Sequence, residues 1–338
     1  LYGSYYGFNQ LDLLIDPISP LIICLLSYLI ITFFNFLFTE LERSKVRTAF
    51  SQYLAPEMVS RLAESSESLK LGGEKKTMTF LFSDIRGFTA ISESYKSNPE
   101  ELTELINKLL TVLSNEILDN EGTIDKYMGD CIMAFWNAPT DQENHTDLAL
   151  QASFDMEKAL ENFNFEFQKE KGMELKIGIG INTGECIVGN MGSEKRFDYT
   201  VLGDPVNLAS RLEGQSGTYG FQRILGQETV NALRSESYLF ELDLIQVKGK
   251  TEPVKIYTSF DKFSLVEDKL IEFQNDHKEF LENYRNQEWD LALNFVEKWE
   301  QQVTEFDLYY AIFKDRIKDM KLNLADPKWN GAYVATTK

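Results

Sequence analysis

Two aspartates stand where apolar, strand-like runs of the sequence end. Asp84 closes a run in which Met78, Phe80 and Phe82 share its strand parity, so its carboxylate should point to the same face as these three apolar side chains. Asp130 follows a glycine in the tight turn of an expected hairpin. Two acids fixed at strand ends suit an oxygen-seeking metal ion, although ordinary turn and capping chemistry also uses aspartate at such places.

A third motif places an amide and a guanidinium on one face of a helix. Asp204 and Pro205 are expected to open this helix and Gly214 to close it. Asn207 and Arg211 are four residues apart, so they share a face. An amide suits a ribose and a planar guanidinium suits a phosphate, whereas an exposed salt-bridging arginine is the alternative for an isolated helix.

Together these three ordered motifs resemble the catalytic domain of the class III adenylate/guanylate cyclases, from about residue 50 to about residue 260. The resemblance implies an α+β fold with a ferredoxin-like βαββαβ core and a mixed sheet. It also implies two Mg²⁺ or Mn²⁺ ions per active site, with Asp84, Asp130 and the backbone carbonyl of Ile85 as metal ligands.

The resemblance assigns further residues to the nucleotide. Asn207 would orient the ribose, Arg211 would stabilise the pentavalent phosphate, and Lys248 would hold the β- and γ-phosphates. Lys126 occupies the position of the adenine-selecting lysine, and Thr200 that of its partner. A lysine donates to the adenine ring nitrogen and a threonine hydroxyl can accept from the amine, whereas guanine would leave buried polar groups unpaired at a cost of about 1–3 kcal/mol.

The expected activity is that of an adenylate cyclase, which converts ATP to 3′,5′-cyclic AMP and pyrophosphate in signal transduction. The family arrangement implies a homodimer with shared sites, in which Asp84 and Asp130 come from one chain and the nucleotide-binding residues from the other. A guanylate cyclase is the rival enzyme, which Lys126 disfavours. A catalytically silent module that only binds nucleotide or partners is the rival from another class, and loss of a metal aspartate or of the arginine would mark it.

The composition limits the remaining choices. A formal net charge of −19 over 338 residues argues against a nucleic-acid binder. The three cysteines show no metal or redox spacing and are expected to be reduced. His145 and His277 are far apart in the sequence and are interpreted as surface or cap residues.

The candidate site residues lie in a sequence whose strand and helix patterns alternate. This alternation predicts a mixed sheet with helices on one face. The expected elements are strand 77–84, helix 99–119, hairpin 123–136, helix 144–170, strands 176–183 and 185–191, helix 204–213, and strands 239–247 and 254–260. Five glycines along the middle strands are interpreted as close-packing sites at a subunit interface: Gly178, Gly180, Gly184, Gly189 and Gly192.

The chain is expected to contain five segments. They are an extracytoplasmic stub (1–16), a transmembrane helix (17–39), a signalling helix and linker (40–74), the cyclase catalytic domain (75–262) and a helical C-terminal extension (263–338). Residues 17–39 carry no charge, and roughly 20 apolar residues span a bilayer; a buried soluble helix is the alternative. Basic residues follow this segment, which predicts a cell (inner) membrane location with the catalytic domain in the cytoplasm.

The flanking regions carry two further expectations. In related membrane cyclases an extracytoplasmic sensor of the CHASE type precedes such a helix, so the resemblance implies one upstream of Leu1. The acidic, aromatic-rich extension contains a weak match to one tetratricopeptide-type helical hairpin, at 288–300 and 306–320. A single repeat cannot bury its own apolar face, so we expect it to pack on the catalytic domain or on a dimer mate.

Overall fold

The computed structural model describes most of the chain, namely residues 5–6, 8–9, 12, 18–50, 72–193, 196–235, 237–246, 252–323 and 329–334. The chain divides into two compact units, Leu1–Ser68 and Leu69–Lys338.

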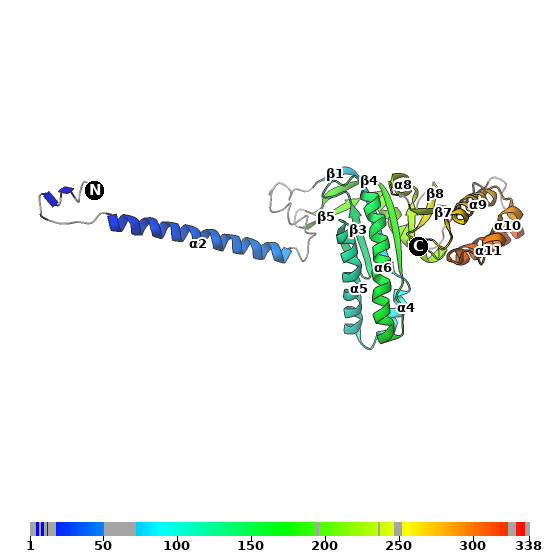
Figure 1. The fold of residues 1–338 in the computed structure, drawn as a ribbon, viewed down its shortest axis with the longest axis horizontal. Helices are drawn as coiled ribbons and strands as arrows, with labels where there is room; N and C mark the ends of the chain where they lie inside the picture. Colours follow the sequence, from blue (N-terminus) through cyan, green and yellow to red (C-terminus); the bar gives the residue numbers. More distant parts are fainter. Residues whose placement is uncertain are drawn as a thin grey trace. The chain divides into compact units, whose positions relative to one another are not determined.

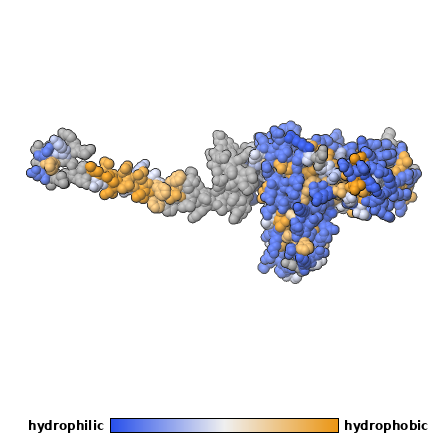
Figure 2. Space-filling view, in the orientation of Figure 1, coloured by the Kyte–Doolittle hydropathy of each residue, from blue (hydrophilic) through white to orange (hydrophobic). Residues whose placement is uncertain are grey.

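The first unit contains the long helix α2 (Ile18–Phe50), which exposes apolar side chains between Leu21 and Leu37 (Figures 1 and 2). Crossing a bilayer takes about 20 predominantly apolar residues. Among the helices in the described ranges, none is long and apolar enough for this. The transmembrane helix predicted at 17–39 is therefore not supported, and the predicted stub and linker lie mostly outside the described residues.

The second unit is built on a mixed sheet, as predicted. Its strands within the described residues are β1 (Gly72–Ile85), β2 (Thr123–Met128), β3 (Cys131–Trp136), β4 (Ile177–Ser193), β5 (Arg196–Leu202), β6 (Arg223–Gly226), β7 (Tyr238–Gln246), β8 (Val254–Phe260) and β9 (Tyr333–Val334). The order β2-β3-β1-β4, antiparallel throughout, is the ferredoxin-like arrangement. The sheet continues through β6, β8, β7 and β9, and β5 pairs with the far half of β4.

Helices cover both faces of this sheet. Their bounds are α4 (Phe88–Ser94), α5 (Pro99–Asp119), α6 (His145–Lys171), α7 (Asp204–Tyr219) and α8 (Gln227–Ala232). α5 and α6 lie side by side (Figure 1) and share one apolar core with Leu81 of β1. On the other face, Val206 and Ala209 of α7 pack with Phe80 of β1. The prediction of helices on one face is therefore wrong, because the central strand buries both of its faces.

Helix α7 differs from the predicted helix at both ends. Gly203 is its N-cap, so Asp204 is the first helical residue rather than the cap. The helix continues through Gly214 and ends at Gly220, which adopts φ 82°. Gly214 and Gly217 lie inside the helix, where each glycine costs about 1 kcal/mol relative to alanine; the burial of Leu212 and Tyr219 opposes that cost.

The strands predicted at 176–183 and 185–191 form one continuous strand, β4, whose glycines serve packing within the chain. A Cβ added at Gly180 would lie 2.2 Å from the backbone nitrogen of Glu213, and one at Gly184 would lie 2.6 Å from Pro205 Cγ. These two glycines thus allow α7 to pack directly on β4. The structure places them under a helix of the same chain, not at a subunit interface as predicted.

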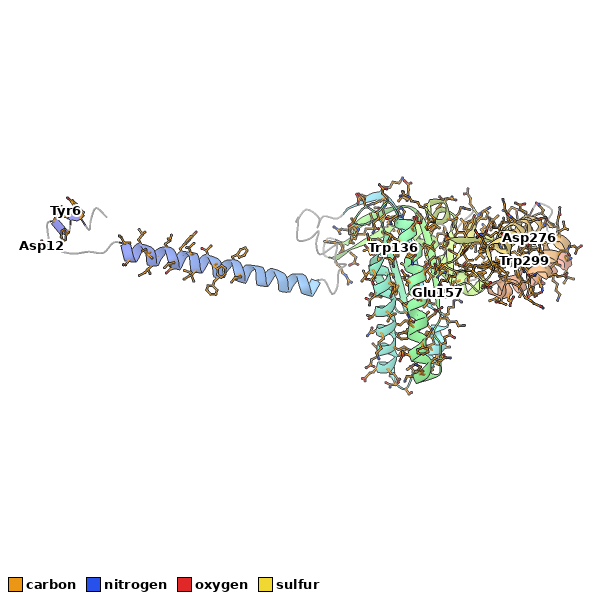
Figure 3. All side chains as sticks on the ribbon, in the orientation of Figure 1. Tyr6, Asp12, Trp136, Glu157, Asp276 and Trp299 are labelled. Atoms are coloured by element: carbon orange, nitrogen blue, oxygen red, sulfur yellow. The ribbon has the colours of Figure 1, made fainter. Side chains whose placement is uncertain are left out.

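The C-terminal helices α9 (Glu267–Arg285), α10 (Trp289–Trp299) and α11 (Asp307–Asn323), with the 3₁₀ turn η2 (Thr304–Phe306), pack on β7 and on the end of α7. Together they bury one aromatic-rich core. Trp299 donates a hydrogen bond to Asp276 at 2.8 Å, which ties α10 to α9 (Figure 3). His277 lies inside this core with 3% of its surface exposed, so its interpretation as a surface or cap residue is wrong.

A buried ion pair joins α11 to the sheet and to α7. Arg316 Nη1 lies 2.6 Å from Asp243 Oδ2, and the Tyr219 hydroxyl donates to the same oxygen at 2.6 Å. Asp243 is fully buried. The extension therefore packs on its own chain, and it contacts the last residue of the helix that carries Asn207 and Arg211.

Candidate functional site

The fold brings Asp84 and Asp130 together. Asp84 lies at the end of β1, and Asp130 lies in the β2–β3 turn, where Gly129 adopts φ 70°. Burial, and then a hydrogen-bonding contact with the Asp130 carboxylate, raise the pKa of Asp84 to about 6. Asp130 Oδ2 is buried and has no hydrogen-bond partner among the described residues. Two carboxylates held this close, with one oxygen unpaired, fit a bound cation.

Glu213 of α7 adds a third carboxylate beside this pair. Burial, and then the charge of Asp84, raise the pKa of Glu213 to about 7, while the Arg86 guanidinium opposes that rise. The absence of a side chain at Gly178, the cross-strand partner of Asp84, makes room, because a Cβ there would lie 2.6 Å from Glu213 Oε1. The sequence did not single out Glu213, although it closes the third motif.

The ligand set for a metal ion is incomplete in side chains alone. Within the described part of the chain, no group of three or more His, Cys, Asp or Glu side chains could hold a metal ion. The sequence analysis predicts the backbone carbonyl of Ile85 as a further oxygen ligand beside the two aspartates. The amide of Ile85 donates to Asp84 Oδ1 at 3.1 Å, which fixes the orientation of that carboxylate.

A second cluster contains Lys126 and Thr200, the residues expected to recognise the base. The structure connects them through Asp125, which the sequence analysis missed. Thr200 Oγ1 donates to Asp125 Oδ2 at 3.1 Å, and Lys126 Nζ lies 3.3 Å from the same oxygen. Burial raises the pKa of Asp125, while the contacts with Thr200 and Lys126 oppose that rise.

Asn207 and Arg211 both lie on α7, as predicted. Asn207 is exposed. The Nη1 atom of Arg211 is buried without a hydrogen-bond partner among the described residues, so it can donate to an anionic ligand. Lys248, the predicted ligand of the β- and γ-phosphates, lies outside the described residues.

Among the residues that the structure describes, the Asp84 and Asp130 pair makes no polar contact with the residues expected to bind the nucleotide. In the described ranges, no hydrogen bond or ion pair joins Asp84 or Asp130 to Lys126, Asn207 or Arg211. Within the described part of one copy of the chain, polar contacts therefore do not link these two sets of residues, although Glu213 and Arg211 share helix α7.

Residues 73–260 match the family described as the adenylate and guanylate cyclase catalytic domain. An adenylate cyclase of Anabaena cylindrica is 35% identical over 222 residues, which are 63% of this chain and 43% of that protein. The solved adenylyl cyclase CyaB of P. aeruginosa is 36% identical, with a TM-score of 0.52 over 58% of this chain and 100% of that one. The solved guanylyl cyclase Cya2 is 35% identical, with a TM-score of 0.51 over 58% and 98%. The chain thus spans less than half the length of the Anabaena protein.

Proposed function

Because the chain belongs to the family of adenylate and guanylate cyclase catalytic domains, we propose that it is an adenylate cyclase that converts ATP to 3′,5′-cyclic AMP and pyrophosphate in signal transduction. The contact between Asp84 and Asp130, with its buried, unpaired carboxylate oxygen, is the observation that carries this proposal. The name of the Anabaena relative supports the choice of ATP.

Each proposed role follows from the chemistry of a side chain. Asp84, Asp130 and the carbonyl of Ile85 would hold two Mg²⁺ or Mn²⁺ ions, which when bound lower the pKa of the ribose 3′-hydroxyl and neutralise the triphosphate. Asn207 orients the ribose through its amide. Arg211 donates to the phosphate on which negative charge gathers during attack.

Base recognition is the role of Lys126 and Thr200, and Lys248 is proposed to hold the β- and γ-phosphates. The Lys126 ammonium group has three N–H donors, so after its contact with Asp125 it can still donate to the adenine ring nitrogen. The Lys126 side chain is 43% exposed, so a ligand can reach it. Guanine has an N–H at that position, so a lysine donor would face another donor.

We further propose that the active unit is a homodimer whose sites combine both clusters from different copies. The lack of hydrogen bonds and ion pairs between these sets of residues within the described part of one chain is consistent with this arrangement. Exposed apolar side chains on β2, β4 and β5, which a second copy could cover, also support it: Tyr127, Met128, Ile187 and Leu202. Ile187 and Leu202 are also register partners across β4 and β5.

The function is tested with the purified chain, Mn²⁺ and either ATP or GTP, by chromatography of the products. We expect cyclic AMP and pyrophosphate, loss of both in Asp130→Asn, and no loss in Asp119→Asn, which removes an exposed acid from α5. Preferred formation of cyclic GMP would make the chain a guanylate cyclase. Nucleotide binding without product would make it a silent regulatory module.

Substrate choice is tested by the double change Lys126→Glu and Thr200→Cys. These changes reverse the hydrogen-bond pattern offered to the base, so the ATP-to-GTP rate ratio should fall even if the absolute rate is poor. An unchanged ratio with lower activity on ATP would mean that this pair has only a structural role.

A location at the cell (inner) membrane with the catalytic unit in the cytoplasm is also proposed. The apolar side chains that α2 exposes between Leu21 and Leu37 support contact with an apolar phase. Cell fractionation tests this proposal, and recovery of the chain in the high-speed supernatant would contradict it.

A further inference from the structure

Asp125 occupies the centre of the base-recognition cluster. Its Oδ2 atom accepts the hydroxyl proton of Thr200 at 3.1 Å and lies 3.3 Å from the ammonium group of Lys126. The Asp125 side chain is 1% exposed, whereas that of Lys126 is 43% exposed. The Asp125 Oδ1 atom is buried without a hydrogen-bond partner among the described residues. The Oδ2 atom alone therefore holds both neighbours, and the hydroxyl and the ammonium group offset part of the cost of burying this carboxylate.

A β-bulge makes this contact possible. Consecutive strand residues normally point to opposite faces, so Asp125 and Lys126 would not meet in a regular strand. Ile124 pairs with Ala134 and Lys126 with Met133, and the β2–β3 register shifts between the two pairs. Asp125 is therefore the extra residue of the bulge. Bulges redirect side chains and are frequent beside active sites.

The hydroxyl of Thr200 reaches Asp125 from a distant part of the chain. Thr200 belongs to β5, which pairs with β4, and the neighbouring Tyr199 packs on Phe135 of β3 with ring centroids 6.4 Å apart. β5 therefore lies against the β2–β3 region. A hydroxyl has a single proton. Because Thr200 gives that proton to Asp125, only its lone pairs are left for a ligand.

We infer that Asp125 is the positioning residue that sets the base preference, because it fixes Thr200 as a hydrogen-bond acceptor and Lys126 as a donor. This inference rests on the proposed function and deepens it. Adenine offers a ring-nitrogen acceptor and an amine donor, which complement that pair. Guanine offers a ring N–H and a carbonyl, so it would place donor against donor and acceptor against acceptor.

The experiment measures kcat/KM of the full chain for ATP, GTP and purine riboside triphosphate, which lacks the 6-amino group. The variant is Asp125→Asn, because asparagine has the same shape as aspartate but its amide can donate a hydrogen bond to the Thr200 oxygen. The Thr200 hydroxyl proton is then free to point toward the base. The control is Asp198→Asn, which removes an exposed charge on β5, two residues before Thr200. Binding of the unreactive 3′-deoxy-ATP and 3′-deoxy-GTP by calorimetry gives a second readout.

In Asp125→Asn we expect the ATP-to-GTP ratio of kcat/KM to fall about tenfold, which is the effect of about one directed hydrogen bond. The ratio in Asp198→Asn should stay within about twofold of the parent chain. Removal of the 6-amino group should lower kcat/KM about tenfold in the parent chain and much less in Asp125→Asn. Thr200→Ser should preserve the dependence on Asp125, because it retains the hydroxyl.

Two failures can be told apart. If the parent chain makes cyclic AMP and Asp125→Asn lowers both rates by the same factor, the proposed function stands and the inference is wrong. If the parent chain makes no cyclic AMP, the proposed function fails, and the calorimetric ratio then decides the inference. An unchanged 3′-deoxy-ATP to 3′-deoxy-GTP ratio in Asp125→Asn would overturn it.

Discussion

His277 should make the folded state sensitive to acid, and His277→Gln should remove that sensitivity. The Nε2 atom lies 2.6 Å from the carbonyl oxygen of Glu241. A carbonyl can only accept, so Nε2 carries the proton of the neutral ring. The Nδ1 atom is buried and has no hydrogen-bond partner among the described residues. A second proton, on Nδ1, would therefore create a positive charge inside an aromatic core. The new N–H group would have no hydrogen-bond acceptor among the described residues.

The magnitude follows from proton linkage. Burial lowers the pKa of His277 to about 4, although the hydrogen bond to Glu241 favours the charged form. The pKa of an unfolded histidine is about 6.5. Because the folded-state pKa is depressed, the stabilisation is fully present above about pH 6.5 and is lost as the pH falls toward 4. Linkage gives a loss of about 2 kcal/mol at pH 5 and about 3 kcal/mol at pH 4.

The assay is urea unfolding of the parent chain and of His277→Gln at pH 7, 5 and 4. The glutamine amide can still donate to the Glu241 carbonyl but does not titrate, so the difference in unfolding free energy between the two proteins isolates the imidazole. Lys278→Gln is the control, because this exposed neighbour stays charged over the whole range. A difference that stays constant from pH 7 to pH 4 would refute a neutral, buried His277.

Three further outcomes are expected. Asp130→Asn should weaken Mn²⁺ binding by at least about tenfold in electron paramagnetic resonance titrations while the circular dichroism spectrum is retained; unaltered affinity would remove Asp130 from the metal site. Asp84→Ala and Arg211→Ala chains, each inactive alone, should recover roughly a quarter of the parent activity when mixed, because about half of randomly paired dimers keep one intact site. A mixture that stays inactive despite demonstrated subunit exchange would contradict shared sites. Arg316→Met should lower the unfolding free energy by about 3–5 kcal/mol in urea titrations, since it leaves Asp243 as a buried, unpaired charge; a loss below about 1 kcal/mol would show that the pair contributes little.

Local periodicity was enough to predict many of the elements that carry the candidate site. The helix at 99–119 and the hairpin at 123–136 have the predicted bounds. The spacing of apolar residues along a helix or strand depends only on residues that are close in the sequence. The two-residue period of a strand places Asp84 on the same face as Phe82. The 3.6-residue period of a helix places Asn207 and Arg211 on one face. Which metal and nucleotide these side chains bind remains a prediction from the resemblance.

Long-range packing decided what the sequence could not. Asp125 meets Lys126 only because a bulge breaks the strand period, and it meets Thr200, 75 residues away, only because β5 lies against the β2–β3 region. Glu213 approaches Asp84 because glycines of β4 admit α7. His277 of α9 is buried against Phe240 of β7, Phe295 of α10 and Tyr309 of α11. Residue type and spacing thus determined the local elements and their faces, whereas register, bulges and helix packing determined which side chains meet, because these depend on contacts between residues far apart in the chain.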